Sequence, residues 1–126
     1  MNTPPPARAV ILLAHGSRDP LWRQPIEAVA SRLRTLASEL PVACAYIELT
    51  EPTLVQAADQ LVQQGARQLT VFPLFLGMGK HAREDVPLLV ETVRRKYPEL
   101  DVRLLPSAGE NADLIDTLAH MALAHT

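Results

Sequence analysis

The sequence predicts an α/β protein with one parallel four-stranded sheet and helices on both of its faces. Apolar runs typical of strands alternate with helix-like periodic segments along the whole chain, in the order β-α-β-α-β-α-β-α. The first run is continuously apolar, as expected for a central strand that is covered on both faces. Such alternation favours right-handed crossovers and a parallel sheet. The length of 126 residues suits a single domain.

The first strand is expected over Arg8 to Ala14. A helix follows within Leu21 to Leu40, because its apolar residues recur with helical spacing, and Pro41 ends it. The second strand is expected over Val42 to Leu49. In the first predicted helix, within Leu21 to Leu40, the apolar positions are 26, 29, 30, 33, 36, 37 and 40.

The second helix should open at Thr50, a polar cap candidate, with Pro52 in its first turn. Gly65 is expected to close this helix. The third strand is expected over Leu69 to Phe75. The apolar stripe of the second helix is formed by Leu54, Ala58, Leu61 and Val62.

The third helix is expected from about Ala82 to Tyr97, after a flexible loop over Gly77 to His81. Pro87 should lie in its first turns, because deeper in the helix it would remove a hydrogen bond. Pro98 stops the helix. Its inward residues are predicted to be Val86, Leu89, Val90 and Val93.

The last pair of elements is a strand over Asp101 to Leu105 and a helix from Asn111 to about Ala124. The helix is expected to turn Ile115, Leu118 and either Met121 or Ala122 toward the core.

Composition limits the classes of function. The net charge of −2 and the scarcity of aromatic residues argue against nucleic-acid binding. No apolar run reaches the ~20 residues of a membrane helix. The single cysteine, Cys44, excludes an intrachain disulfide, and we expect a cytoplasmic protein. Residues 1–7, which are rich in proline, are expected to be a disordered lead, and residues 8–126 form the domain.

Chemically active side chains follow three of the predicted strands. His15 follows the first, Glu48 ends the second, and His81 follows the third. A strand order of 2-1-3-4 would bring them to one edge of the sheet, where open α/β sheets bind ligands. Two imidazoles and a carboxylate suit Fe, Co, Ni or Zn as divalent ions, with open coordination positions. Each residue alone could instead be a solvated polar group. His120 and His125 are interpreted as surface residues.

A basic rim surrounds the two histidines, and it predicts an anionic small-molecule ligand. The alternative is a solvated basic surface. The segment around Gly79 departs from a P-loop, and no dinucleotide fingerprint follows the first strand, so no nucleotide cofactor is expected. His15-Gly16-Ser17 also departs from a nucleophile elbow. The rim consists of Arg18, Arg23, Lys80 and Arg83.

Three ordered blocks resemble sirohydrochlorin chelatases of the CbiX type. The first runs from Leu12 to Pro20 and contains His15, Gly16 and Ser17. The second comprises Ala45 to Glu48 with Pro52. The third comprises Pro73 to Leu76, then Gly79-Lys80-His81 and Asp85-Val86-Pro87. The resemblance covers the chain from about Arg8 to Ala124.

The resemblance implies one half of a class II chelatase fold, flavodoxin-like and built in three α/β/α layers. It implies ATP-independent insertion of cobalt or iron into sirohydrochlorin, in cobalamin or sirohaem biosynthesis, with a homodimer building the cleft. His15 and His81 would bind the metal, with Glu48 as the matching carboxylate, and one of the three would accept a pyrrole proton.

Further residues are expected to bind the tetrapyrrole in such a site. Arg18, Lys80 and Arg83 would hold its carboxylates, and Leu76 and Met78 would cover the ring. Ser17 and Asp85 would orient the histidines. The flanking glycines Gly16 and Gly79 complete the predicted substrate-binding set.

Other functions remain open at the level of sequence. A nickel chelatase of the same family is one, although the histidine-rich loop of many nickel-handling relatives is missing here. A non-catalytic carrier of metal or tetrapyrrole is another. A hydrolase using Ser17 or His15 would lack an identifiable triad partner, and a plain interaction domain would make the three-residue grouping a coincidence.

Overall fold

The computed structural model describes residues 7–126 and confirms the expected architecture. All four strands are parallel and lie in the order β2-β1-β3-β4. Apart from Ala7, the lead expected over residues 1–7 lies outside the described residues. Within 7–126, every helix falls short of the length or hydropathy that crossing a bilayer requires. The strands are β1 (Arg8–Ala14), β2 (Val42–Tyr46), β3 (Gln68–Pro73) and β4 (Asp101–Leu104).

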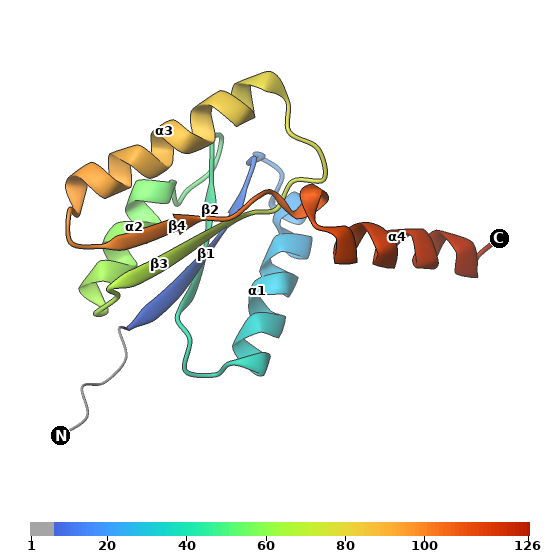
Figure 1. The fold of residues 1–126 in the computed structure, drawn as a ribbon, viewed down its shortest axis with the longest axis horizontal. Helices are drawn as coiled ribbons and strands as arrows, with labels where there is room; N and C mark the ends of the chain where they lie inside the picture. Colours follow the sequence, from blue (N-terminus) through green and yellow to red (C-terminus); the bar gives the residue numbers. More distant parts are fainter. Residues whose placement is uncertain (1–6) are drawn as a thin grey trace.

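The helices pack on both faces of this sheet (Figure 1). One face is covered by α1 over β2 and β1, and the other by α2 and α3, which also pack against each other. Two short 3-10 helices, η1 (Pro20–Arg23) and η2 (Ala108–Glu110), precede the first and last α-helices. The α-helices are α1 (Gln24–Leu36), α2 (Leu54–Gln63), α3 (Lys80–Lys96) and α4 (Ala112–Ala124).

The main core lies between the sheet and the α2–α3 layer. Side chains of β1 such as Ile11 and Leu13 are fully buried there, together with Leu54 of α2 and Val90 of α3. A smaller core lies under α1, where Ile26 packs with other buried residues. Burial on both faces explains why the β1 sequence is continuously apolar.

Several element boundaries differ from the sequence prediction. Strand β2 ends at Tyr46 rather than Leu49, and the chain turns at Leu49, whose φ is +69°. Helix α2 begins after Thr53 rather than Thr50. The Thr53 hydroxyl accepts a hydrogen bond from the Gln56 amide, and the Gln56 side chain accepts one from the Thr53 amide. This reciprocal cap explains the later start.

Helix α3 begins at Lys80, two residues earlier than expected, with Gly79 at its N-cap. Pro87 is therefore the eighth helical residue, slightly deeper in the helix than the first turns in which it was expected. Its missing amide leaves the carbonyl of Arg83 without its usual intrahelical donor, and both residues are exposed to solvent. Val86, Val90 and Val93 are buried as predicted, and Leu89 is half-buried.

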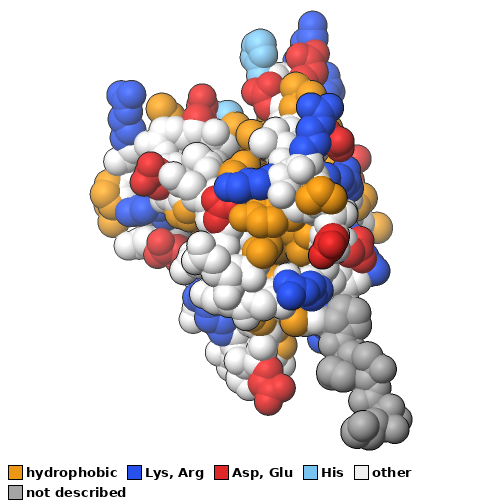
Figure 2. All heavy atoms as spheres, turned by 90° about the vertical axis from the view of Figure 1, so that its left-hand side faces the viewer, with side chains coloured by type: hydrophobic (Ala, Val, Ile, Leu, Met, Phe, Trp, Pro, Cys, Tyr) orange, Lys and Arg blue, Asp and Glu red, His pale blue; other side chains and the backbone are white. Residues whose placement is uncertain are grey.

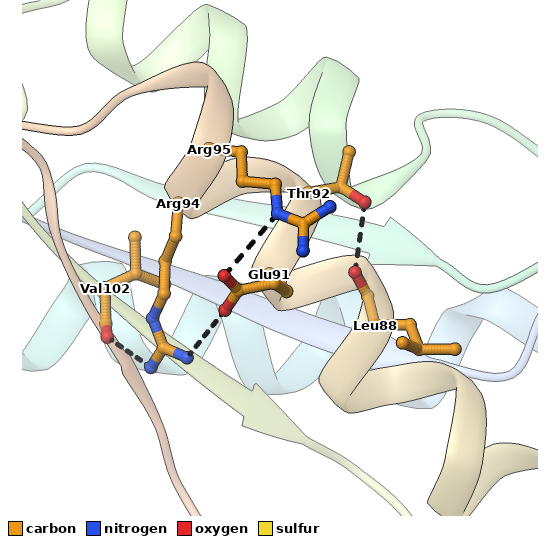
Figure 3. Close-up of polar contacts among 6 residues, drawn as sticks. All are labelled: Leu88, Glu91, Thr92, Arg94, Arg95 and Val102. Atoms are coloured by element: carbon orange, nitrogen blue, oxygen red, sulfur yellow. Dashed lines mark hydrogen bonds and ion pairs between the residues drawn. The ribbon is translucent and has the colours of Figure 1, made fainter.

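Arginines in the last turns of two helices bind the edge strands. Arg94 of α3 donates a hydrogen bond to the Val102 carbonyl of β4 at 2.9 Å (Figure 3). Glu91 forms ion pairs with both Arg94 and Arg95. On the opposite side, Arg34 of α1 donates to the Val42 carbonyl of β2 at 2.8 Å. These contacts satisfy polar backbone groups that an edge strand leaves unpaired.

The last helix differs most from the prediction. Ile115, Leu118 and either Met121 or Ala122 were expected to face the core, yet all four residues are exposed. None of the 13 residues of α4 is buried, and the helix extends away from the sheet (Figure 1). The amphipathic pattern identified an apolar side correctly, but not a surface for it to pack on.

A polar contact joins α2 to the end of α3. The Asp59 carboxylate accepts hydrogen bonds from Lys96 at 2.8 Å and from the Tyr97 hydroxyl. The hydrogen bond from Lys96, then that from Tyr97, lowers the pKa of Asp59 below its ordinary value. The same bonds to Asp59 raise the pKa of Lys96 and of Tyr97.

Replacing Asp59 with Asn should lower the unfolding free energy at pH 7. The ionised carboxylate stabilises the fold through these bonds, so the difference between variant and wild type should be lost as the pH falls through the lowered pKa of Asp59. It should also shrink above about pH 10, as Tyr97 and Lys96 lose their protons. Urea unfolding across this pH range measures the effect, with Glu84→Gln at an exposed position of α3 as control. If the difference in unfolding free energy did not change with pH, the bonds from Lys96 and Tyr97 to the Asp59 carboxylate would not be its cause.

Candidate functional site

The histidine after β1 and the glutamate after β2 are in direct contact. His15 Nε2 lies 2.9 Å from Glu48 Oε1. Both side chains are about half exposed, at 52% and 54%. When Nε2 carries the proton and donates it to the carboxylate, the lone pair of Nδ1 is free to accept a proton or bind a metal. The pair therefore has the chemistry of a metal ligand supported by a carboxylate.

The backbone beneath this pair is tightly packed. The His15 carbonyl accepts hydrogen bonds from the amides of Ile47 and Glu48, both at 3.1 Å. Gly16 adopts φ +113°, and a Cβ there would lie 1.8 Å from the Glu48 carbonyl oxygen. Only glycine fits this contact without moving the chain. Gly16 thus sets the approach of the two loops that carry His15 and Glu48.

His81 lies in the first turn of α3, rather than in the mobile loop expected from the two preceding glycines. It is exposed, and the structure gives it no hydrogen bond within residues 7–126. Over the same residues, no three His, Cys, Asp or Glu side chains lie close enough to hold one ion. The expected grouping is therefore formed in part: His15 and Glu48 meet, while His81 stands apart on the helix that follows β3.

The N-terminus of α3 is unusually basic. Lys80 and Arg83 flank His81, and the first turn contains no acidic residue. The free amides and the dipole at a helix N-terminus already favour anions, so cations here raise the local positive potential further. The arrangement is suited to bind a carboxylate or another anion.

Other predicted residues take different positions from those expected. The Ser17 hydroxyl accepts a hydrogen bond from the Asp19 amide, and among residues 7–126 it forms no hydrogen bond to His15. Asp85 lines a groove with Ile47 and Leu89 and, within residues 7–126, forms no hydrogen bond or ion pair with either histidine. Arg18 is exposed without a polar partner in residues 7–126. His120 and His125 are exposed, as predicted.

Arg23 belongs to a separate hollow between α1 and β2, together with Cys44 and Tyr46. Burial raises the pKa of both the Cys44 thiol and the Tyr46 hydroxyl. The Tyr46 ring also packs against Trp22, with ring centroids 6.1 Å apart. Arg23 is thus part of the packing around β2.

A groove of about 450 Å³ opens beside the β3–α3 loop. Three residues predicted to contact substrate, Leu76, Met78 and Arg83, line it. Its far wall is formed by η2, which the sequence analysis missed because the end of β4 carries no conspicuous chemical groups. The wall residues are Ser107, Gly109 and Glu110.

Glycine again holds two loops together at this groove. The Gly109 amide donates to the Phe75 carbonyl at 2.8 Å, and a Cβ on Gly109 would lie 1.7 Å from the Leu76 carbonyl oxygen. The Glu110 carboxylate accepts hydrogen bonds from the amide and hydroxyl of Ser107. The Ser-x-x-Glu spacing is a capping-box signal that could have located this turn from sequence.

Charge is mixed over the face drawn in Figure 2. Basic and acidic side chains alternate around a small apolar area, and histidine side chains stand at its upper end. This agrees with a net charge of only −2. The basic group of Lys80 and Arg83 is thus a local feature of the first turn of α3, and Glu84 and Asp85 follow it directly in the same helix.

A family model matches residues 9–123, which include both glycine-supported junctions together with His15 and His81. This model is that of CbiX. The chain belongs to the CbiX family. The match covers all four strands and nearly all of α4.

Solved structures share the fold of this CbiX chain. One, from Marinobacter aquaeolei VT8 and described as a cobalamin (vitamin B12) biosynthesis CbiX protein, is 34% identical with a TM-score of 0.78. The match covers 94% of this chain and 99% of that one. The sirohydrochlorin chelatase SirB from Bacillus subtilis subspecies spizizenii, in complex with cobalt, is 26% identical with a TM-score of 0.77. It matches 90% of this chain and 48% of that one.

Curated relatives are longer than the CbiX chain described here. The sirohydrochlorin cobaltochelatase of Methanopyrus kandleri is 34% identical over 82 residues, covering 65% of this chain and 57% of the relative. The sirohydrochlorin ferrochelatase of Priestia megaterium is 29% identical over 111 residues, covering 87% of this chain and 41% of the relative. The chain thus spans about half the length of these relatives.

Replacing Gly16 with Ala should destabilise the fold by about 2–4 kcal/mol, from positive-φ strain and the overlap with Glu48. Urea unfolding measures the loss. Gly77→Ala is the matched control, because no atom lies within 4 Å of a Cβ added there. It should change stability by no more than about 0.5 kcal/mol. Equal losses in the two variants would show that close packing at Gly16 is unimportant.

Proposed function

We propose that this chain catalyses ATP-independent insertion of a divalent metal ion, cobalt or iron, into a sirohydrochlorin-type tetrapyrrole. The observation that carries the proposal is the contact between His15 and Glu48 at the ligand-binding edge of a CbiX fold. Relatives named as a cobaltochelatase and a ferrochelatase, and a related SirB structure with cobalt, support the reaction class. Such a reaction would serve cobalamin or sirohaem biosynthesis.

Insertion exchanges two pyrrole N–H protons for one divalent ion. His15, with Nε2–H donating to Glu48, would offer Nδ1 as the metal ligand or proton acceptor. His81 would supply the second imidazole from the first turn of α3. Because one nitrogen cannot hold a metal and a proton together, the other histidine or Glu48 would receive one pyrrole proton as the metal leaves for the ring. The second proton would pass to the imidazole nitrogen that the metal has vacated.

The basic start of α3 would hold the peripheral carboxylates of the macrocycle. Lys80 and Arg83 lie there, and Arg18 is free to reach toward substrate from the loop after β1. Met78 would contact the ring from the wall of the groove beside Arg83. The remaining members of the proposed substrate site are Gly16, Ser17, Gly79 and Asp85.

A homodimer would complete the cleft, because His15 and Glu48 are half exposed on one copy and a tetrapyrrole must be covered to exclude water. Nucleotide and nucleic acid have no role in this proposal. The cytoplasm is the proposed compartment, in keeping with a chain that has a single cysteine.

An anaerobic absorbance assay with sirohydrochlorin and Co²⁺ or Fe²⁺, without ATP, tests the reaction. His15→Ala and His81→Ala should each lower the rate at least about 100-fold, as expected for loss of a ligand or general base. His120→Ala, on exposed α4, should retain wild-type turnover. Near-normal rates of metal insertion in both His15→Ala and His81→Ala would contradict the mechanism. Tetrapyrrole binding without turnover by the wild type would identify a carrier instead.

Arg18→Ala should raise the KM for sirohydrochlorin while leaving kcat largely unchanged, because a carboxylate contact remote from the metal contributes uniform binding. Loss of one exposed charge-assisted contact should raise KM about 3- to 10-fold. Arg32→Ala, exposed on α1, is the control. An unchanged KM in Arg18→Ala would remove Arg18 from the substrate site.

A further inference from the structure

A hollow of about 270 Å³ lies between α1 and the edge strand β2, and neither His15 nor Glu48 lines it. Positions 23, 27, 30 and 34 line one side of it, because residues three or four apart share a face of a helix. Cys44 and Tyr46 line the other side from one face of β2. This space is called the β2 hollow. Its polar lining consists of Arg23, Glu27, Arg34, Cys44, Tyr46 and Glu51.

The Tyr46 hydroxyl is a buried polar group that faces the β2 hollow. Tyr46 is only 2% exposed, and within residues 7–126 no side chain or carbonyl forms a hydrogen bond with its hydroxyl. Among the same residues, every side-chain oxygen that is fully cut off from solvent has a partner. The hydroxyl therefore keeps a small accessible surface, at the hollow that Tyr46 lines. Buried hydroxyls normally have a hydrogen-bond partner, and a ligand in the hollow would supply one.

Two arginines and two glutamates surround this hydroxyl without pairing with one another. Within residues 7–126, no ion pair joins any of the four to another charged group. The charges of the lining therefore balance, and each remains available to a charged ligand. The four residues are Arg23, Glu27, Arg34 and Glu51.

Two of these charges are better placed for a ligand than the others. Arg34 already donates to the backbone of β2, and Glu51 accepts a hydrogen bond from a side chain of α2 at 3.5 Å. Arg23 and Glu27 make no side-chain hydrogen bond within residues 7–126. Burial is the main cause that raises the pKa of the Tyr46 hydroxyl, Glu27 adds to it, and Arg23 opposes it. The hydroxyl thus keeps its proton at neutral pH, with both charges close to it.

A lining of mixed charge selects a ligand that carries both charges itself. A purely anionic molecule would be attracted by Arg23 but repelled by Glu27, and a purely cationic molecule the reverse. A guanidinium binds a carboxylate through two parallel N–H donors, and a carboxylate accepts hydrogen bonds from an ammonium group. The volume lies below the range of about 300–1,000 Å³ that is typical of pockets for drug-sized ligands, so the ligand must be small.

We propose that the β2 hollow binds a free α-amino acid. Arg23 binds its carboxylate, and Glu27 accepts hydrogen bonds from its ammonium group. The Tyr46 hydroxyl donates a further hydrogen bond to the carboxylate. The site does not depend on the proposed function, because none of these three residues takes part in metal insertion. It is nevertheless adjacent in sequence, since Tyr46 and Glu51 flank the short segment that carries Glu48.

Isothermal titration calorimetry of the full chain with each common α-amino acid, without metal or tetrapyrrole, tests the site. At least one amino acid should bind with a Kd of about 1 mM or tighter. Arg23→Gln and Glu27→Gln should each weaken this binding at least about 10-fold, because each removes a charge-assisted contact. Tyr46→Phe, which loses one neutral hydrogen bond, should weaken it about 5-fold. Arg32→Gln, exposed on α1 outside the hollow, should bind like the wild type. Circular dichroism checks that each variant is folded.

Two analogues of the amino acid that binds distinguish a zwitterion site from a plain anion or cation site. The matching carboxylic acid lacks the ammonium group, and the matching amine lacks the carboxylate. Each should bind at least about 10-fold more weakly than the amino acid itself. Equal binding of either analogue, or no binding of any α-amino acid by folded wild-type protein, would overturn the proposal.

Cys44 gives a local readout, because it is the only cysteine of the chain and lines the hollow. At a saturating concentration of the amino acid, alkylation of the Cys44 thiol by iodoacetamide should slow at least about 5-fold, because the ligand blocks access to the sulfur. At the same concentration, Glu27→Gln should lose this protection and Arg32→Gln should keep it. An alkylation rate that did not change at saturation would place the bound amino acid elsewhere on the protein and overturn the proposal.

Discussion

The junction at the end of β1 is the constraint on which the candidate site depends. The His15 carbonyl accepts two amides from the loop after β2, and this requires Gly16 to approach the Glu48 backbone without a side chain. The same junction brings the His15 ring to the Glu48 carboxylate. Residues of β1 are buried on both faces of the sheet, so packing holds the end of this strand in place. The core of the domain therefore determines the position of the His15 imidazole.

A second glycine junction gives the other half of the site a different character. Gly109 fixes the loop after β3 through Phe75 and Leu76, and α3 starts four residues beyond Leu76. His81 is therefore carried by helix α3, whereas His15 directly follows strand β1 of the sheet. The two histidines belong to separate rigid elements, and a metal bound by both would register any change in the distance between sheet and helix.

Local patterns were sufficient to predict the sheet, because each strand is short, apolar and bounded by turn residues. They failed where the same local sequence was compatible with more than one backbone structure. Gly77 and Gly79 looked like a loop, but Gly79 caps a helix, so His81 was placed in a flexible segment. The pair of His15 and Glu48 was predictable because strand order alone brings adjacent strand ends together. The η2 wall was missed because its contribution is backbone packing, not a chemical group.

The predicted inward stripe of α4 shows where sequence periodicity stops being informative. Periodicity identifies an apolar side, and only the connection before the helix decides which surface is within reach. Here η2 and Asn111 direct α4 away from its own sheet, so Ile115, Leu118 and Met121 stay exposed. The exposed stripe is therefore a consequence of the turn before the helix and not of the helix sequence itself. Since η2 also forms a wall of the groove beside the β3–α3 loop, the direction of α4 and the shape of the groove depend on one structural element.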